Sequence, residues 1–323
     1  MFFSKRSWLL CALLLLMPVC WAVAQTGGKT VVRRAKWPKF DKRATQSVFL
    51  EDVFSKLEGE RPANLVVAAK PAGGKPSGGG AAGASADVAP TGEWASIISP
   101  TTIEDEVKAL KLVVDEAVTT PGKFAGNDYK TARREFSVLA MLFAIINTYD
   151  GDVRWKDQAA ASRDVFARTA ANAKVGTSQV YNEAKLRKQE LQDLIGGAAL
   201  PDRPASAQND WSQICDRGPL MQRLETSLNT KLQPWTSNKA EFAKHSEELF
   251  HEAEITAAIS AVLAKPGMED GEDEDYAAFA KTMQKAARDI VDAVKLNNAE
   301  QASSAVGVIN KACSECHELY RSS

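Results

Sequence analysis

The sequence has little net charge and, after its first residues, no long apolar run. Its 40 Lys and Arg residues are balanced by 41 Asp and Glu residues, which gives a formal net charge of −1 at pH 7. This balance argues against nucleic acid or another strongly charged partner. Beyond Val19, no apolar run approaches the ~20 residues that a membrane-spanning helix needs, so we expect no membrane span.

Side chains that act as nucleophiles or metal ligands are also scarce. The chain has three histidines and five cysteines, namely Cys11, Cys20, Cys215, Cys313 and Cys316. No nucleophile-base-acid constellation and no glycine-rich phosphate loop is recognisable, so the sequence does not predict an enzyme. Cys215 has no neighbour to pair with, and we expect it to be a small buried hydrophobe.

The N-terminus has the pattern of a secretory signal. Two basic residues precede an apolar run from Trp8 to Val19, and Ala22-Val23-Ala24 forms a small-x-small cleavage site. Residues 1–24 are therefore predicted to be a signal peptide, and the mature protein is expected to be soluble and periplasmic. A lipid anchor on Cys20 is disfavoured because the residue directly before it is not small.

Two segments of biased composition follow. Residues 25–69 are basic, with Lys and Arg gathered around Trp37 and Phe40, and a short helix is predicted from Ser47 to Leu57. We interpret this segment as a solvated arm, with a docking patch for a redox partner as the alternative. Residues 70–92 are rich in Gly, Ala, Ser and Pro and are predicted to be a flexible linker.

From Glu93 onward, apolar residues recur at helical spacing with almost no strand signal. The expected helices are 103–117, 128–147, 155–174, 178–195, 219–232, 240–264, 275–295 and 302–320. Short turns join them, and a Gly- and Pro-containing break separates the first four from the last four. The predicted fold is all-α, with two tandem antiparallel four-helix bundles over residues 93–197 and 205–323.

The last part of the chain contains the pattern C-x-x-C-H, formed by Cys313, Cys316 and His317. A c-type haem is attached covalently to such a sequence. Residues three apart lie on one face of a helix, so both thiols can reach one porphyrin edge and the adjacent imidazole can bind the iron. The apolar stripe from Ala302 to Tyr320 includes both cysteines, so we expect one covalent haem c inside a helical bundle.

Two other uses of a C-x-x-C pair are a redox dithiol and a zinc site. A redox dithiol is typical of a βαβ context, and no alternating β-branched run lies near these cysteines. A zinc site needs four ligands, and outside the motif the mature chain offers only Cys215, His245 and His251. Haem attachment is favoured over both.

With C-S-E-C-H-E-L-Y-R at its end and Ala305-Val306-Gly307 before it, the chain resembles the cytochrome c prime family and its methionine-ligated relatives. The likeness is specific over residues 299–321. In that family the haem lies in an antiparallel four-helix bundle, bound by the last helix, with an aromatic residue and an arginine three and four positions after the histidine. The resemblance implies that Tyr320 and Arg321 lie near the haem.

The resemblance also concerns the far side of the iron. In that family the first helix carries an Arg-x-x-x-Met or Arg-x-x-x-Leu element whose last residue sits over the iron. The stretch from Arg217 to Met221 fits this spacing, which implies Arg217 near the haem and Met221 as distal ligand. Pro219 is typical of a first helical turn, so we expect Met221 near the helix end. The alternatives are an open iron site, with Met221 as core filler, and ligation by His245.

The two halves of the helical region have matching landmarks, which indicate a tandem duplication. Trp211 echoes Trp94, and Phe242 falls where Phe124 does. The alignment places Leu191, Leu194 and Ile195 opposite Cys313, Cys316 and His317. The first bundle is therefore predicted to lack haem and to be filled with core side chains.

An acidic stretch surrounds Gly271 between the helices predicted at 240–264 and 275–295. Its members are Glu269, Asp270, Glu272, Asp273, Glu274 and Asp275. We expect these acids to mark a helix N-terminus, where the backbone dipole favours them. A calcium site is the alternative, but the ligand register of an EF-hand is missing.

These observations predict a periplasmic monohaem cytochrome that transfers single electrons between periplasmic redox proteins. A homodimer is compatible with the sequence. One alternative is a five-coordinate haem protein that binds nitric oxide or carbon monoxide. Another is a structural or adaptor protein that has a haem site.

Overall fold

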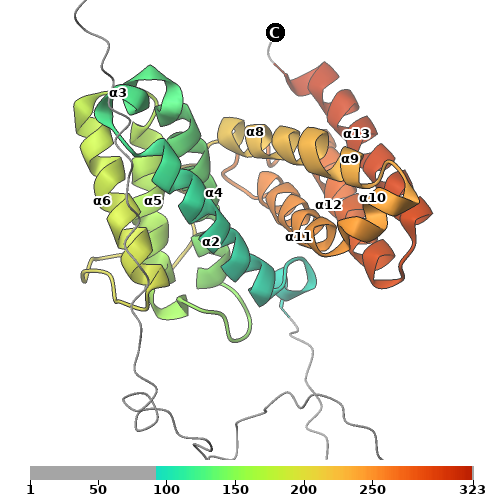
Figure 1. Ribbon diagram of the computed structural model, residues 1–323, viewed down its shortest axis with the longest axis horizontal. Coiled ribbons are helices and arrows are strands. Elements are labelled where there is room, and N and C mark those ends of the chain that lie inside the picture. The colour runs from blue at the N-terminus through green and yellow to red at the C-terminus, as the bar shows by residue number, and fades with distance from the viewer. Residues whose placement is uncertain (1–91, 322–323) are drawn as a thin grey trace, which may run out of the picture. The chain divides into compact units, whose positions relative to one another are not determined.

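The computed structural model describes residues 92–321. The predicted signal peptide, the basic arm and nearly all of the linker lie outside the described residues. Within residues 92–321 the chain is helical and contains no strand (Figure 1), which confirms the all-α prediction. No helix in this part of the chain is long and apolar enough to cross a membrane.

The first helix set comprises the helices between Trp94 and Ile195. Its elements are η2 (Trp94–Ser96), α2 (Pro100–Ala117), α3 (Pro121–Lys123), η3 (Phe124–Asp128), α4 (Tyr129–Asn147), η4 (Lys156–Gln158), α5 (Ala159–Asn172) and α6 (Ser178–Ile195). Helix α4 packs on α2 and α5, and α6 packs on the same two helices. N-caps fix where the helices begin: the hydroxyl of Ser99 accepts from the backbone N–H of Thr102, and that of Thr177 from Val180.

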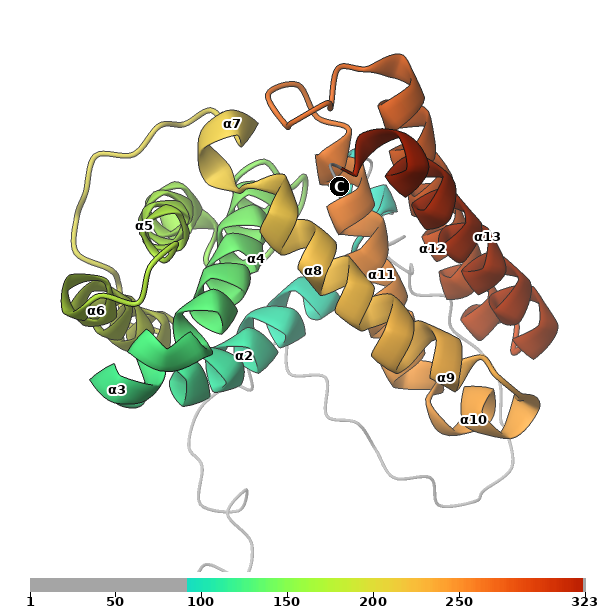
Figure 2. The same ribbon diagram turned by 90° about the horizontal axis from the view of Figure 1, so that it is seen from above.

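The second helix set comprises the helices from Arg217 to Tyr320. After α7 (Trp211–Ile214), its elements are α8 (Arg217–Ser227), η5 (Leu228–Leu232), α9 (Gln233–Trp235), α10 (Lys239–Lys244), α11 (Ser246–Leu263), α12 (Glu274–Lys295) and α13 (Ala299–Tyr320). Helices α11, α12 and α13 pack in sequence against one another. Figure 2 shows α8 lying between these helices and the first helix set.

Several helices begin a few residues away from their predicted bounds, and two of these differences concern candidate iron ligands. The helix expected over 240–264 is interrupted at His245, where the backbone leaves the helical region (φ −113°, ψ 24°). Its ring stacks on Trp235, with centroids 5.1 Å apart. The helix expected from Pro219 begins earlier, at Arg217, so Met221 lies in the second turn.

The two helix sets are in direct contact. Trp94 and Trp211, which the sequence alignment makes equivalent, lie with ring centroids 6.2 Å apart. The connection between the sets is held by buried Arg163, which donates to the carbonyls of Ser206 (2.8 Å) and Gln208 (3.1 Å). Helix α8 also packs more extensively on α4 than on α11 of its own set. The division into two self-contained four-helix bundles stays a prediction.

Candidate cofactor site

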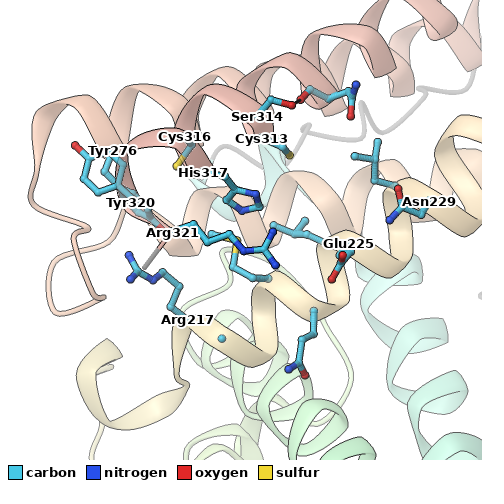
Figure 3. Close-up of a pocket in the computed structure, with 16 residues that line it drawn as sticks. Arg217, Glu225, Asn229, Tyr276, Cys313, Ser314, Cys316, His317, Tyr320 and Arg321 are labelled. Carbon is cyan, nitrogen blue, oxygen red and sulfur yellow. Dashed lines mark hydrogen bonds between the residues drawn. The ribbon is translucent and has the colours of Figure 1, made fainter. Parts of the chain in front are cut away.

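A cavity of about 440 Å³ separates α8 from α13 (Figure 3). Its lining includes every residue that the sequence and the resemblance assigned to a haem site, namely Arg217, Met221, Cys313, Cys316, His317, Tyr320 and Arg321. They come from two helices that are far apart in sequence. The same wall adds Leu224 of α8 and Leu228 of η5, and α12 contributes Tyr276, so the cavity has an apolar body with polar groups at one end.

The two thiols lie on the cavity side of α13. Cys316 is buried and Cys313 half-buried, and the Cys313 Sγ lies 3.5 Å from the Met283 Sδ on α12. Burial raises the pKa of Cys313 to about 11 and also raises that of Cys316, so both groups are protonated thiols at neutral pH. Both thiols are free, and Figure 3 shows them on one face of the helix, as their spacing predicts.

His317 follows directly on α13 and is exposed. Figure 3 shows its imidazole extending from α13 toward α8. Met221 lies on the opposite wall and is partly buried against the core. Because Met221 stands in the second turn of α8, the helix itself holds it, contrary to the expectation of a helix end.

The acidic loop, residues 264–273 between α11 and α12, contacts side chains at the polar end of the cavity. Arg217 on α8 forms ion pairs with Glu269 (2.7 Å) and Asp270 of this loop. On the other wall, the Tyr320 hydroxyl donates to the Asp273 Oδ1 (2.5 Å). The acidic loop thus contacts both cavity walls.

The acidic stretch also begins α12, as predicted. Asp273 is the N-cap and accepts from the backbone N–H groups of Asp275 and Tyr276, each at 3.0 Å. Among residues 92–321, no three His, Cys, Asp or Glu side chains are grouped so that they could hold a metal ion. The calcium alternative therefore has no support from this part of the chain.

Tyr276 is a site residue that sequence reasoning missed. Its ring lies under the Arg217 guanidinium (5.6 Å to the centroid) and edge-on to Tyr320 (5.2 Å between centroids). The hydroxyl is buried without a well-formed hydrogen bond to any described residue, and burial raises its pKa to about 12. A buried phenol of this kind is a ready donor to a polar group of a ligand. The sequence offered no signal for it beyond its place at the start of α12.

The other histidines lie away from the cavity. His245 stacks on Trp235, and the His251 Nε2 lies 2.9 Å from the Glu106 Oε2 on α2. Neither lines the space between α8 and α13. The arrangement of the described residues therefore gives no support to His245 as an iron ligand.

Cys215 is buried, as predicted, just before α8. Burial raises the pKa of its thiol to about 12, so it is an inert side chain at neutral pH. It is separate from the cavity lining.

The cavity and its donors fit a haem group. Its volume falls within the roughly 300–1,000 Å³ of small-molecule and cofactor sites. Two thiols on one helix face suit covalent attachment, and an imidazole and a thioether on opposite walls suit axial binding of iron. The arginines and the Tyr276 hydroxyl offer donors for the porphyrin carboxylates.

No protein-family model, no curated protein and no solved structure matches the chain.

Proposed function

We propose that this protein is a periplasmic, monohaem c-type cytochrome that carries single electrons between periplasmic redox proteins. In this proposal the haem lies between α8 and α13, within a cytochrome c prime-like four-helix bundle that forms the second of two tandem bundles. The observation that supports it most is the shared cavity. The C-x-x-C-H residues line one wall, while Arg217 and Met221, far away in sequence, line the other.

Each residue has a role in this proposal. Cys313 and Cys316 hold the porphyrin through thioether bonds, and His317 binds the iron from the α13 side. Met221 completes the coordination from α8, which suits electron transfer because methionine ligation raises the reduction potential. When bound, the haem iron supplies a one-electron change between ferrous and ferric states.

The remaining lining controls the surroundings of the iron. Leu224 on α8 and Leu228 on η5 cover the cavity wall with apolar surface and keep water away. A dry environment disfavours the extra charge of the ferric form, so these side chains also favour a higher potential. The ion-paired Arg217 and the tyrosines keep the polar end of the cavity ordered.

An open iron site is the second candidate function. Leucine side chains flank Met221 on the α8 wall, so a Met221 that does not reach the iron would leave an apolar pocket above it. Such a pocket suits a small neutral ligand such as carbon monoxide or nitric oxide.

The test uses the full-length gene expressed in a host that matures c-type cytochromes. The intact mass should exceed that of the polypeptide by one haem. The oxidised protein should show a methionine-to-iron charge-transfer band that Met221→Leu abolishes. Met283→Leu is the matched control, because Met283 contacts Cys313 from α12 and should leave the band unchanged.

Each outcome separates the candidates. A mass equal to the bare polypeptide would refute haem attachment. A high-spin ferric spectrum, identical in wild type and Met221→Leu, together with carbon monoxide binding that displaces no ligand, would replace electron transfer with gas binding.

A further inference from the structure

The two faces of α8 have different environments. The cavity face carries Met221 and Leu224 and continues into Leu228 of η5, while the opposite face carries fully buried Leu220 and the buried side chains of Arg223 and Ser227. The opposite face packs on α4 of the first helix set and on α11. The helix that forms one wall of the cavity is therefore packed on both helix sets.

A buried ionic cluster fixes this opposite face. The Arg223 Nη2 lies 3.0 Å from the Glu106 Oε1 on α2 and 3.1 Å from the Glu252 Oε2 on α11. Lys231 approaches the same Glu252 carboxylate at 2.6 Å, and His251 approaches Glu106 at 2.9 Å. The cluster joins α8 to one helix from each set.

The side chains of this cluster are charged, and their pairing depends on the positions of the helices that carry them. Arg223 lowers the pKa of Glu252 to about 2 and that of Glu106 below its usual value, which offsets the effect of burial. Removal of one partner of a buried pair leaves an uncompensated charge, so such pairs define one arrangement of the helices that carry them. Arg223 can keep both of its carboxylate partners only if α8 stays where it is.

On the cavity face, the hydrophobic effect favours a movement of α8 toward α13. Met221 on α8 and Cys313 on α13 line the cavity and are only partly buried, so they would bury more apolar surface if α8 moved toward α13 and the cavity closed. The backbones of these two helices hardly approach each other, whereas those of α2 and α6 pack together in the first set. Something other than α13 must therefore hold α8 in place.

We propose that the first helix set keeps the cavity open. In this proposal Glu106 on α2 binds Arg223, and Arg223 is the positioning residue that keeps α8 away from α13. This gives the half of the chain without the C-x-x-C-H motif a definite role in the site. Only the cofactor readouts of this inference depend on the proposed function.

The test compares three buried glutamates in the full-length protein. Glu106→Gln removes the carboxylate charge that the first helix set places beside Arg223. Glu190→Gln removes a charge that pairs with Arg187 on α6 and with Arg203 in the connection that follows α6. Glu254→Gln removes one that bonds Ser99 and Arg288 across the two sets without touching α8.

The first readout is amide hydrogen exchange, which needs no haem. In Glu106→Gln, exchange within α8 should rise about tenfold relative to α12, since Glu252 still holds Arg223. The two control variants should leave exchange within α8 unchanged, although Glu254→Gln also removes a partner of Arg288 on α12. In haem-loaded protein, Glu106→Gln alone should also shift the reduction potential and the absorption spectrum.

Two results would overturn the inference. One is a uniform rise of exchange in all helices of Glu106→Gln, which means general destabilisation. The other is equal α8 exchange in all three variants. If Glu106→Gln does not fold, Glu106→Asp keeps the charge at a shorter reach and should produce the same α8-specific rise, more weakly. Absence of haem from the mass spectrum would refute the proposed function but leave the exchange comparison valid.

Discussion

Helices α6 and α13 occupy equivalent places in the predicted duplication but have different surroundings. On α6, Leu191 and Leu194 are fully buried, and the helix packs on both α2 and α5. On α13, the aligned Cys313 and Cys316 face a cavity, and the helix packs on α12 without a close approach to α8. Two leucines fill the space that two cysteines leave open. The comparison indicates that a few side chains decide whether such a helix set is filled by its own side chains or keeps a cavity.

The largest expected effect concerns the α13 cysteines. A double substitution, Cys313→Ala with Cys316→Ala, should abolish covalent haem completely, because no thiol remains to form a thioether. Intact mass and haem staining of denatured protein measure this. Cys215→Ala is the control, since Cys215 is buried outside the cavity. Haem retained covalently by the double variant would contradict the assignment.

The next effect concerns the aligned leucine of α6. Leu194→Ala should lower the free energy of unfolding by about 2–5 kcal/mol, because it leaves a void among fully buried side chains. Denaturant unfolding followed by circular dichroism measures the loss. The haem content per folded chain should not change. A clear loss of haem in this variant would mean that the two fourth helices do not differ in the way described.

Buried glutamates in the two sets should respond to pH with opposite sign. The folded pKa of Glu252 is lowered to about 2 from 4.5, so its stabilising effect is present above pH 4.5 and is lost as the pH falls toward 2. The free energy of unfolding should fall by on the order of 3 kcal/mol over this pH range. Burial raises the pKa of Glu135 on α4, so its charged form disfavours folding at neutral pH.

Unfolding free energies between pH 2 and pH 7 test this pair. Glu252→Gln should be destabilising at pH 7 and should flatten the acid branch of the curve. Glu135→Gln should be neutral or stabilising at pH 7. Equal destabilisation by both variants at pH 7 would show that the two carboxylates are not in opposite situations.

The smallest effect concerns the helix N-caps, where the two sets are alike. The Thr177 hydroxyl caps α6, and the Asn298 side chain caps α13 by accepting from the backbone N–H of Gln301. Replacement of either by alanine should cost about 1 kcal/mol. Thermal unfolding should show similar shifts for both variants, and neither should alter haem content. A much larger effect at Asn298 would indicate that α13 depends on its cap in a way that α6 does not.

Much of the helical pattern could be predicted from sequence. The helix at 178–195 has the predicted bounds, because a threonine cap begins it and glycines follow it. The residues of the candidate site were also found in advance, since the C-x-x-C-H spacing and the Arg-x-x-x-Met spacing are local patterns. The described structure brings these residues to one cavity.

Non-local features could not be predicted. Helical periodicity predicts a helix over 219–232, but not that α8 packs on α4 of the first helix set. Arg223 and Glu106 look like ordinary surface charges in the sequence, because their burial depends on helices far apart in the chain. The acidic loop was recognised as a helix start, but its contacts with Arg217 and Tyr320 depend on how α8 and α13 are placed.

The hydrogen bonds that Arg163 donates to the segment before α7 limit how the two helix sets can move relative to each other. A chain with two similar halves often joins them by a free hinge, about which one half can swing to meet different partners. Here the buried Arg163 side chain on α5 donates hydrogen bonds to the carbonyls of Ser206 and Gln208, which ties that joint to the first helix set. We therefore expect the two helix sets to move together, because a swing of one set about this joint would break the hydrogen bonds of Arg163.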